Sequence, residues 1–379
     1  MTTVPIEAPS GVPFAILSRP QRRFTSQQTV SNLSAGGSFA VTQLSATGWV
    51  RRVSLLFTQS VTVASAGAVV AGDGPWNLIS AISLSDATGQ PIVQPISGYN
   101  LYLVNKYMPS APPKNGPWPF KNPHLGPEFA FAATATTGTA VFRLDIEFEI
   151  DEQTGYGSIP NLDSNASLQL RVDFAPYTNA FSGVTPSAAS LSMRVTQEYW
   201  APVGDSIGGV ATRSAPPGAG DYLETRYETQ TVTASAENLI SLTNKGGLIR
   251  GVILASRAAG ARTAFTAGAN VGFLLDNQDI NSGITLEDHN NQFRQKSGYF
   301  GADLTTSYAP LGAGVMAGID RGVVVMNWDY LSGGRDSWLN TRAGSQLQAR
   351  ITPGAAATQL EVITVLAQAK ELASFYDAA

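Results

Sequence analysis

A motif of eight residues occurs twice in this chain, and it restricts the folds that the chain can adopt. Residues Gly48–Leu55 and Gly247–Leu254 share the pattern G-φ-φ-R-x-V-x-L, in which φ is an apolar residue. Repetition of a motif at long range is the mark of a duplicated structural unit. The sequence therefore predicts two copies of one unit in tandem, built from the same elements in the same order.

Three further pairs of segments support the duplication, because they follow one another in the same order in both halves. They are Gln28–Ser31 with Gln230–Thr233, Leu168–Val172 with Leu347–Ile351, and Leu191–Val195 with Leu360–Thr364. The separation between partners falls from 199 residues at the eight-residue motif to 179 and then 169. We therefore expect shorter loops in the second copy.

The hydrophobic pattern within each copy is typical of β-strands. In Ala140–Ile150, apolar residues alternate with charged ones, which predicts a strand with one buried face. Similar short runs, set between turns that draw on 37 glycines and 22 prolines, predict an all-β sandwich or barrel in each copy. Helices are predicted only for the short segments Ser97–Tyr107, Leu286–Lys296 and Gln368–Tyr376.

The distribution of glycine and proline predicts where the two units begin and end. The segment 201–226 is rich in both residues and has the composition of a linker. The predicted parts are an N-terminal arm at 1–24, a first β-domain at 25–200, the linker at 201–226, a second β-domain at 227–367 and a C-terminal segment at 368–379.

Composition favours a self-associating protein over an enzyme. Charged residues make up only 14% of the chain, and the cations are 18 arginines against 6 lysines, the choice that protein interfaces favour. Cysteine is absent and histidine occurs twice, so we predict no metal site, no cofactor and no catalytic centre. The net charge is −4 without a basic block, which argues against direct binding of nucleic acid.

Two segments are candidates for contacts with other molecules. The segment Pro109–Pro127 holds seven prolines and cannot join the interior of a sheet. It forms either an ordered surface loop or an arm against a neighbouring subunit, with Trp118 and Phe120 as anchors. Near the N-terminus, Arg19, Arg22 and Arg23 are either solvated or in contact with anionic lipid or a neighbouring copy.

Other polar groups have a chemical interpretation and a plainer structural one. Asp145, Glu147, Glu149 and Asp151 are predicted to lie on one strand face, as a catalytic or cation-binding set or as a solvated or intersubunit face. The oxygen-rich Asp276–Asn281 departs from the calcium-loop spacing and is predicted to be a turn. His124 and His289 lack partners in the sequence and are predicted to be packing or surface residues.

The first domain carries three consecutive segments that resemble a known family. Asp73–Ile79 leads into a strand, the turn Asp86–Gln90 follows, and Ser97–Asn105 is predicted as a flanking helix. In their order and in their residues the segments resemble the first jelly roll of the double jelly-roll major capsid proteins of tectivirus-like tailless, membrane-containing bacteriophages. Elsewhere the resemblance rests on topology and length. The N-terminal arm departs from the family because it has no long, Gln-rich amphipathic helix.

The resemblance implies two tandem jelly rolls with short flanking helices, in a structural protein without enzymatic activity. Copies would form homotrimers, each a pseudo-hexameric block that tiles an icosahedral virion shell. Their partners would be neighbouring capsomers, penton or minor capsid proteins, and an internal membrane. The protein would be synthesised in the host cytoplasm and end in the virion.

Two alternative functions stay open at the level of sequence. A carbohydrate-binding or carbohydrate-active protein of two jelly rolls would need a cleft with paired carboxylates, for which the acidic strand Asp145–Asp151 is the candidate. A minor vertex or spike protein of the same virion type would share the fold and differ in copy number.

Overall fold

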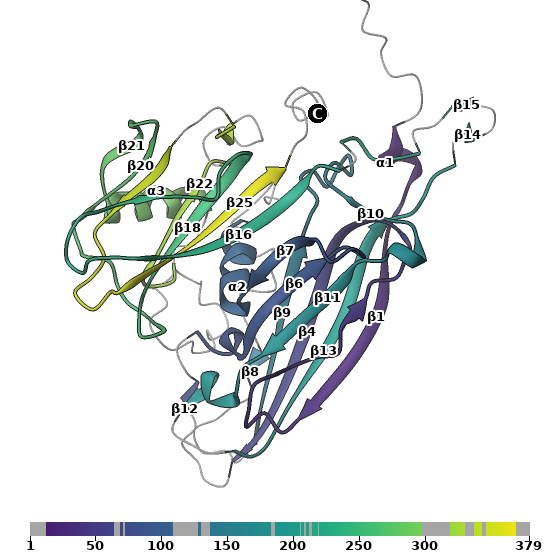
Figure 1. Cartoon of the computed structure of the whole chain (residues 1–379), viewed down its shortest axis with the longest axis horizontal. Helices are drawn as coiled ribbons and strands as arrows, with labels where there is room; N and C mark the ends of the chain where they lie inside the picture. The colour runs from purple at the N-terminus through teal and green to yellow at the C-terminus, as the bar shows by residue number, and fades with distance from the viewer. Residues whose placement is uncertain are drawn as a thin grey trace, which may run out of the picture.

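The computed structural model describes residues 13–63, 69–70, 73–108, 128–129, 137–182, 186–204, 206–207, 210–211, 214–218, 220–297, 319–329, 337–342 and 346–368. They form two β-sandwiches, one from each half of the chain, which lie side by side (Figure 1). We call them the first roll and the second roll. Each has a large sheet of six strands packed against a smaller sheet.

The first roll is formed by strands from residues 20–200. Its large sheet has the order β1-β13-β4-β9-β8, with β10 beside β4: β1 (Pro20–Ser31), β13 (Pro186–Trp200), β4 (Gly48–Val63), β9 (Thr137–Glu147), β8 (Glu128–Phe129) and β10 (Ile159–Asn161). Its small sheet has the order β2-β11-β6-β7, with β3 beside β11: β2 (Gly37–Ser38), β11 (Gln169–Phe174), β6 (Ile79–Ser85), β7 (Pro91–Ile96) and β3 (Thr42–Gln43).

The second roll repeats this arrangement with shorter strands. Its large sheet has the order β16-β25-β18-β19, with β22 and β23 also beside β18: β16 (Tyr222–Thr231), β25 (Gln359–Gln368), β18 (Leu248–Ala258), β19 (Ala261–Arg262), β22 (Val323–Asn327) and β23 (Leu339–Asn340). Its small sheet has the order β17-β24-β20-β21: β17 (Asn238–Ser241), β24 (Leu347–Ile351), β20 (Asn270–Leu275) and β21 (Gln278–Thr285).

The repeated segments of the sequence occupy equivalent strands of the two rolls. The eight-residue motif opens β4 in the first roll and β18 in the second, the following pair forms β11 and β24, and the last pair lies in β13 and β25. In both rolls four antiparallel strands of the large sheet face four of the small sheet in the same chain order. This is the jelly-roll topology, so the predicted fold class is confirmed.

Among the described residues, each roll has one helix between the last strand of its small sheet and the next strand of its large sheet. In the first roll this helix is α2 (Gly98–Tyr107), whose N-cap Ser97 accepts a hydrogen bond from the backbone N–H of Asn100. In the second roll it is α3 (Leu286–Ser297). Both agree with the predicted helices. The third predicted helix lies outside the described residues except for Gln368, which ends β25.

The remaining elements are short. Helix α1 (Phe14–Leu17) precedes β1 and was not predicted from the sequence. Two small pairings join β5 (Val69–Val70) to β12 (Phe181–Ser182) and β14 (Ser206–Ile207) to β15 (Val210–Ala211), and 3-10 turns occur at Trp76–Leu78, Ser164–Ala166 and Tyr177–Asn179. No helix within the described residues is long and apolar enough to cross a membrane.

Candidate functional site

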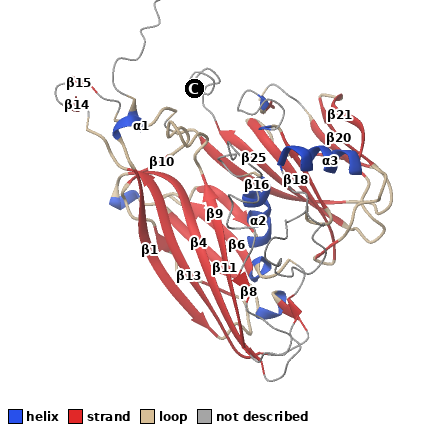
Figure 2. Ribbon diagram, turned by 180° about the vertical axis from the view of Figure 1, so that it is seen from behind, coloured by secondary structure: helices blue, strands red, loops and turns tan. Residues whose placement is uncertain are grey.

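The helix α2 lies between the two rolls, where Figures 1 and 2 both show it. Every residue of α2 is buried, although a helix on the surface of one domain would expose a polar face. Leu103 and Tyr107 belong to one continuous hydrophobic cluster that also includes Ile253 of β18 and Ile363 of β25. The core of the first roll therefore extends through α2 to the outer face of the second roll's large sheet.

Burial on both faces explains the composition of β18. Its side chains alternate between two cores, because Val252 and Leu254 face the small sheet of the second roll while Ile253 and Ala255 face α2. A Cβ atom at Gly251 would lie 2.4 Å from Cε of Met108, the residue that follows α2. Glycine at this position thus permits the close approach of the helix end to the sheet.

The first polar contact across this junction joins α2 to Asp320, which precedes β22. Nζ of Lys106 and the hydroxyl of Tyr107 each lie 2.6 Å from Oδ2 of Asp320, and the side chain of Lys106 is fully buried. Burial by itself would raise the pKa of Asp320, but the ammonium of Lys106 and the guanidinium of Arg262 outweigh it and hold the pKa below its usual value. The pair is therefore charged and compensated, as a buried pair must be to be tolerated.

A second contact joins Asp73 of the first roll to two arginines of the second. Nη1 of Arg257 lies 2.6 Å from Oδ2 of Asp73, and Nε of Arg262 donates to Oδ1. Both guanidinium groups also lie 5.2 Å from the ring centre of Tyr99 in α2. Asp73 begins the segment on which the resemblance to capsid proteins was founded, and here it binds one roll to the other.

The third contact caps the end of α2. The last carbonyls of a helix have no partner within it, so they need outside donors when they are buried. The carbonyl of Tyr107 accepts from Nδ2 of Asn327 at 3.1 Å, and that of Met108 accepts from Nη1 of Arg250 at 3.2 Å. Both donors come from the second roll, so the helix of one roll is completed by the sheet of the other.

The arginine of the repeated motif contacts a carboxylate and a tryptophan in both rolls, and we call each such set a constellation. Arg51 Nε lies 2.6 Å from Oε2 of Glu149, and Trp200 Nε1 donates to the other oxygen of that carboxylate. In the second roll Arg250 Nε lies 2.6 Å from Oδ2 of Asp329, and Trp338 Nε1 donates to Oδ1. Each guanidinium also lies over its tryptophan ring. The first constellation supports α1, since Phe14 packs edge-on against Trp200, whereas the second supports α2.

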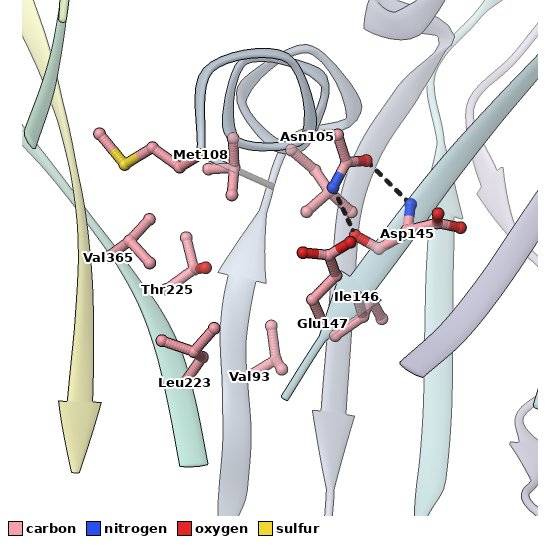
Figure 3. A pocket seen from close by; sticks show the side chains of 11 residues that line it. Val93, Asn105, Met108, Asp145, Ile146, Glu147, Leu223, Thr225 and Val365 are labelled. Atoms are coloured by element: carbon pink, nitrogen blue, oxygen red, sulfur yellow. Dashed lines mark hydrogen bonds between the residues drawn. The ribbon is translucent and has the colours of Figure 1, made fainter. Parts of the chain in front are cut away.

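A small cavity lies beside α2, between the two rolls (Figure 3). Its volume is about 20 Å³, enough for about one water molecule. At its edge the side chain of Asn105 pairs with the backbone of Asp145, accepting from its N–H at 2.9 Å and donating to its carbonyl at 2.8 Å. This pairing fastens α2 to β9, and the cavity is too small for an organic substrate.

The acidic strand was predicted to carry four carboxylates on one face, and this is wrong. Strand β9 ends at Glu147, because the carbonyl of Arg51 accepts from the N–H groups of both Phe148 and Glu149 and ends the regular ladder. Glu149 is buried against Trp200, and Asp151 accepts hydrogen bonds in the turn that follows. Only Asp145 and Glu147 share the outer face of the strand.

On that outer face, charges of opposite sign alternate across four strands. Arg22, Glu198, Arg52 and Glu147 occupy paired positions on β1, β13, β4 and β9. Arg22 Nε lies 2.8 Å from Glu198, and Arg52 lies within 4 Å of both Glu198 and Glu147. Asp145 is nearly fully buried and is paired with Arg143 at 2.9 Å. The structure therefore uses these carboxylates in an ion-pair network.

The other candidate residues from the sequence are placed as follows. Arg19 precedes β1, while Arg22 and Arg23 lie on it and are exposed, so the strand begins inside the predicted arm. Asp276 and Asn277 form the turn between β20 and β21, with positive φ angles of 50° and 64°, whereas the rest of the predicted turn, Gln278–Asn281, belongs to β21. The residue limits given to the domains stay a prediction.

Of the two histidines, one lies in the part of the chain that the structure describes. His289 is buried in α3 with Nε2 2.9 Å from the carbonyl of Val325, so it is a packing residue as predicted. Its burial lowers its pKa. Trp118, Phe120 and His124 lie outside the described residues, and the role predicted for them stays a prediction. Within the described residues no group of three or more His, Asp or Glu side chains could hold a metal ion.

Solved structures with this architecture cover nearly the whole chain. A chain of the atomic structure of Sulfolobus Turreted Icosahedral Virus superposes with a TM-score of 0.64 at 12% identity, covering 93% of this chain and 91% of that one. The Faustovirus major capsid protein gives a TM-score of 0.58 at 8% identity, covering 97% and 92%. The major capsid protein of bacteriophage PM2 gives 0.51 at 11% identity, covering 93% and 99%. No protein-family model and no curated protein matches the sequence.

The chain has the double jelly-roll fold of viral major capsid proteins. The resemblance inferred from Asp73–Asn105 is thereby confirmed at the level of fold. Sequence reasoning missed the double jelly roll's buried junction. Lys106 and Asp320 are 214 residues apart, and lysine in a short predicted helix is ordinarily a surface residue.

Proposed function

We propose that this chain is the major capsid protein of an icosahedral virus, and that it acts by self-assembly. The observation that carries the proposal is the likeness to capsid proteins over nine-tenths or more of both chains, with both rolls included. A likeness to one jelly roll alone would be weak support, because that architecture serves many functions. Two rolls in tandem, in the same order and at the same length, are a much narrower pattern.

The buried junction is what such a role requires. A shell subunit must present its contact surfaces in a fixed geometry, so its two rolls cannot swing on a linker. Here α2 is shared by both cores, and three sets of buried polar contacts, at Asp320, Asp73 and Arg250, specify one arrangement of the rolls. The chain is therefore suited to serve as one rigid block with two lobes.

The finer parts of the proposal concern partners and place. Three chains would form a pseudo-hexameric homotrimer, and trimers would contact neighbouring capsomers and penton or minor capsid proteins. The resemblance to tailless phages extends the proposal to a bacterial host, in whose cytoplasm the chain is made, and to an internal membrane. Trp118 and Phe120 are proposed as intersubunit contacts, and Arg19, Arg22 and Arg23 as contacts with the membrane or a neighbouring copy.

The experiment that tests this proposal is the expression of the virus's structural genes followed by purification of particles. The account predicts icosahedral particles in which this chain is the most abundant protein. Particles in which it is present at a few copies, at the vertices alone, would instead identify a minor vertex or spike protein. Binding to a panel of glycans, lost on substitution of Asp145 and Glu147 in a protein that forms no particles, would favour the carbohydrate-binding alternative.

A further inference from the structure

A hollow of about 430 Å³ lies at one tip of the first roll, away from the junction between the rolls. Ser31, the last residue of β1, lines it, whereas α1 precedes the first residue of that strand, so the hollow and α1 lie at opposite ends of the roll (Figure 1). Its volume falls in the range of small-ligand sites, roughly 300–1,000 Å³. The lining residues come from β1 and the loop after it, from β4 and β13, and from the 3-10 turn that begins at Tyr177.

Backbone hydrogen bonds hold the floor of the hollow in place. The N–H of Asn32 donates to the carbonyl of Ala189 at 2.9 Å, and the N–H of Tyr177 donates to the carbonyl of Leu33 at 2.9 Å. Leu33 and Ala189 are buried, and Tyr177 is half-buried against the core of the first roll. Three segments that are distant in sequence are thus tied together, so the hollow is preformed, as ligand sites usually are.

One wall of the hollow is a row of three serines on the outer face of the large sheet. Ser31, Ser190 and Ser60 occupy directly paired positions on β1, β13 and β4, and we call them the serine row. The charged row that begins at Arg22 crosses the same three strands near their other ends. Every described residue that lines the hollow is uncharged. One sheet face therefore has a charged end and a neutral, hydroxyl-bearing end.

The polar groups of the hollow are not used within the described part of the chain. No other described residue is hydrogen-bonded to the hydroxyls of the serine row or to that of Tyr177. The carboxamide oxygen of Asn32 accepts from the N–H of Ser34 at 3.4 Å, which leaves its NH₂ group to donate outwards. Because a hydroxyl both donates and accepts, this surface can satisfy a ligand that is itself dense in hydroxyl groups.

We propose that the hollow binds a neutral sugar unit, a hexose or N-acetylhexosamine within a glycan chain. The serine row and Asn32 exchange hydrogen bonds with the hydroxyls of the sugar, and the ring of Tyr177 offers an apolar surface to its C–H groups. The inference goes beyond the proposed function, since the site belongs to one roll of one chain whether or not the chain assembles.

The chemistry of the hollow favours a neutral sugar over other ligands. A charged ligand would leave water for a lining that offers it no opposite charge. A protein partner is disfavoured because protein interfaces are depleted in serine and depend on buried aromatic or arginine anchors. A sugar is neutral and carries donors and acceptors on one ring, which is what the lining can satisfy.

Repetition of the hollow on every copy of a shell would strengthen the binding of a polymer. One sugar unit in an open site binds in the millimolar range. Many equivalent sites raise the effective affinity for a polysaccharide without any new contact. Under the proposed function the arginines near α1 contact the membrane or a neighbouring copy, so the hollow at the other end of the roll faces outwards. It is then placed to bind a polysaccharide of the host surface.

Saturation-transfer NMR of the full-length chain with trisaccharides tests the site. The neutral probes are maltotriose, cellotriose, mannotriose and chitotriose, and the charged probe is trigalacturonate, each at millimolar concentration. We expect transfer to at least one neutral probe and none to trigalacturonate. The neutral probe with the strongest transfer is then titrated to obtain its Kd.

A blocking variant locates the binding. Ser60→Trp places a large side chain in the hollow from an exposed position, so it should abolish transfer to the neutral probe. The matched control is Ser80→Trp, because Ser80 is also an exposed strand serine of the first roll but lies in the small sheet. The control should bind the probe as the wild type does.

A second set of variants removes hydroxyls without filling the hollow. Ser31→Ala, Ser190→Ala and Ser60→Ala together should raise the Kd about tenfold or more, because three hydrogen bonds to the sugar are lost. The matched control changes Thr29, Ser192 and Thr58 to Ala, since this next row crosses the same three strands outside the hollow. Its Kd should change by about twofold or less.

The outcomes decide between this site and the alternatives. Binding of a neutral probe that is lost in Ser60→Trp and in the serine-row variant, and kept in both controls, supports the proposal. Absence of binding by every neutral probe, equal binding of trigalacturonate, or equal effects in test and control variants overturns it. Loss of binding on substitution of Asp145 and Glu147 instead would place the sugar on the acidic strand and overturns it as well.

Two further results separate the sugar site from the proposed function. If no sugar binds and Ser60→Trp lowers the mass of the assembled chain, the hollow is a contact between copies, and the sugar proposal falls while the capsid assignment stands. If the chain binds the neutral probe at the serine row but forms no particles, the sugar site stands and the capsid assignment falls.

Discussion

The two rolls share one strand order, yet the outer face of the large sheet carries exposed residues in the first roll and is buried in the second. In β4 of the first roll, buried Val53, Leu55 and Phe57 alternate with outward residues such as Arg52 and Leu56. In β18 of the second roll both sets of side chains are buried, and the middle of the strand, Gly251–Ala255, is continuously apolar. The difference teaches that duplication kept the topology while the environment of each face determined its residues.

The helices show the same contrast. Helix α2 is buried on every side because both rolls pack on it, and α3, in the equivalent position, keeps a polar side. The contact within the chain is thus apolar with buried ion pairs, whereas the outer sheet face of the first roll exposes Arg22 beside Phe24 and Leu56. Under the proposed function, a chain built in this way combines a permanent junction with a separate set of contacts for assembly.

The largest effect should come from a matched pair of substitutions at the equivalent positions Ala255 and Leu56, which each follow the repeated motif. Ala255 of β18 is fully buried in the core that the two rolls share, so Ala255→Asp should cost about 4 kcal/mol or more in unfolding free energy and leave little soluble protein. Leu56→Asp should change that free energy by less than about 1 kcal/mol. Urea unfolding followed by tryptophan fluorescence measures both. Equal losses at the two sites would contradict the contrast between the two faces.

The second prediction concerns Lys106, which is buried in the junction. Lys106→Met removes the main counter-charge of Asp320 and should destabilise the chain by about 3 kcal/mol, because an uncompensated buried carboxylate remains. Adding Asp320→Asn should recover part of the loss, since the neutral amide needs no counter-charge. Thermal unfolding of Lys106→Met, Asp320→Asn and the double variant beside the wild type gives the comparison. If the double variant is as unstable as the sum of the two single variants, the pair does not act as a unit.

The third prediction is a dependence on pH from Glu149 in the first roll. Burial raises the pKa of Glu149 to about 7, against the opposing effects of Arg51 and Trp200. The native state then binds a proton that the unfolded state has released between about pH 4.5 and 7. The contribution of this group is therefore favourable at low pH and is lost as the pH rises, by up to about 3 kcal/mol for such a shift.

Melting temperatures between pH 5 and 8 test this sign. Glu149→Gln keeps an acceptor for Trp200 and cannot titrate, so its stability should vary less over that range than that of the wild type. A stability of Glu149→Gln that falls with pH as steeply as that of the wild type would assign the effect to another group.

The smallest effect should distinguish the two arginines of the repeated motif. Arg250→Met removes the guanidinium partner of Asp329 and also a donor to the carbonyl of Met108, whereas Arg51→Met leaves Glu149, whose pKa burial already raises, able to take up a proton. We therefore expect Arg250→Met to be the more destabilising by about 1–2 kcal/mol at neutral pH. Denaturant midpoints of the two variants measure this difference in stability. Equal destabilisation of the two variants, or the reverse order, would contradict the prediction.

Much of the fold could be predicted from this sequence, because periodicity and repetition are local. Alternation in Ala140–Ile150 predicted a strand, and the repeated G-φ-φ-R-x-V-x-L predicted equivalent strands, which proved to be β4 and β18. The short helix at Ser97–Tyr107 was also correct to within a residue. Helix α1 was not predicted, because four residues are too few to show a periodic hydrophobic pattern.

The junction could not be predicted, because its partners share no spacing. The repeated arginine can be recognised in the sequence, but its carboxylate partner is Glu149 in one roll and Asp329 in the other. Its tryptophan partner precedes the linker in the first roll and follows β22 in the second. Likewise, the acidic strand left open a catalytic or cation-binding set beside a solvated or intersubunit face, because the sequence does not show Arg52 and Arg143 lying beside it. Contacts between strands that are distant in sequence need the three-dimensional fold.

The most direct test of the central claim is the absolute mass of the purified chain, measured by light scattering at low and high salt. The account predicts a particle of three times 39.9 kDa at low salt, which dissociates towards folded monomer as salt screens the polar contacts. A folded chain of 39.9 kDa at every concentration and salt would contradict it, because a block that never binds its own copies cannot build a shell.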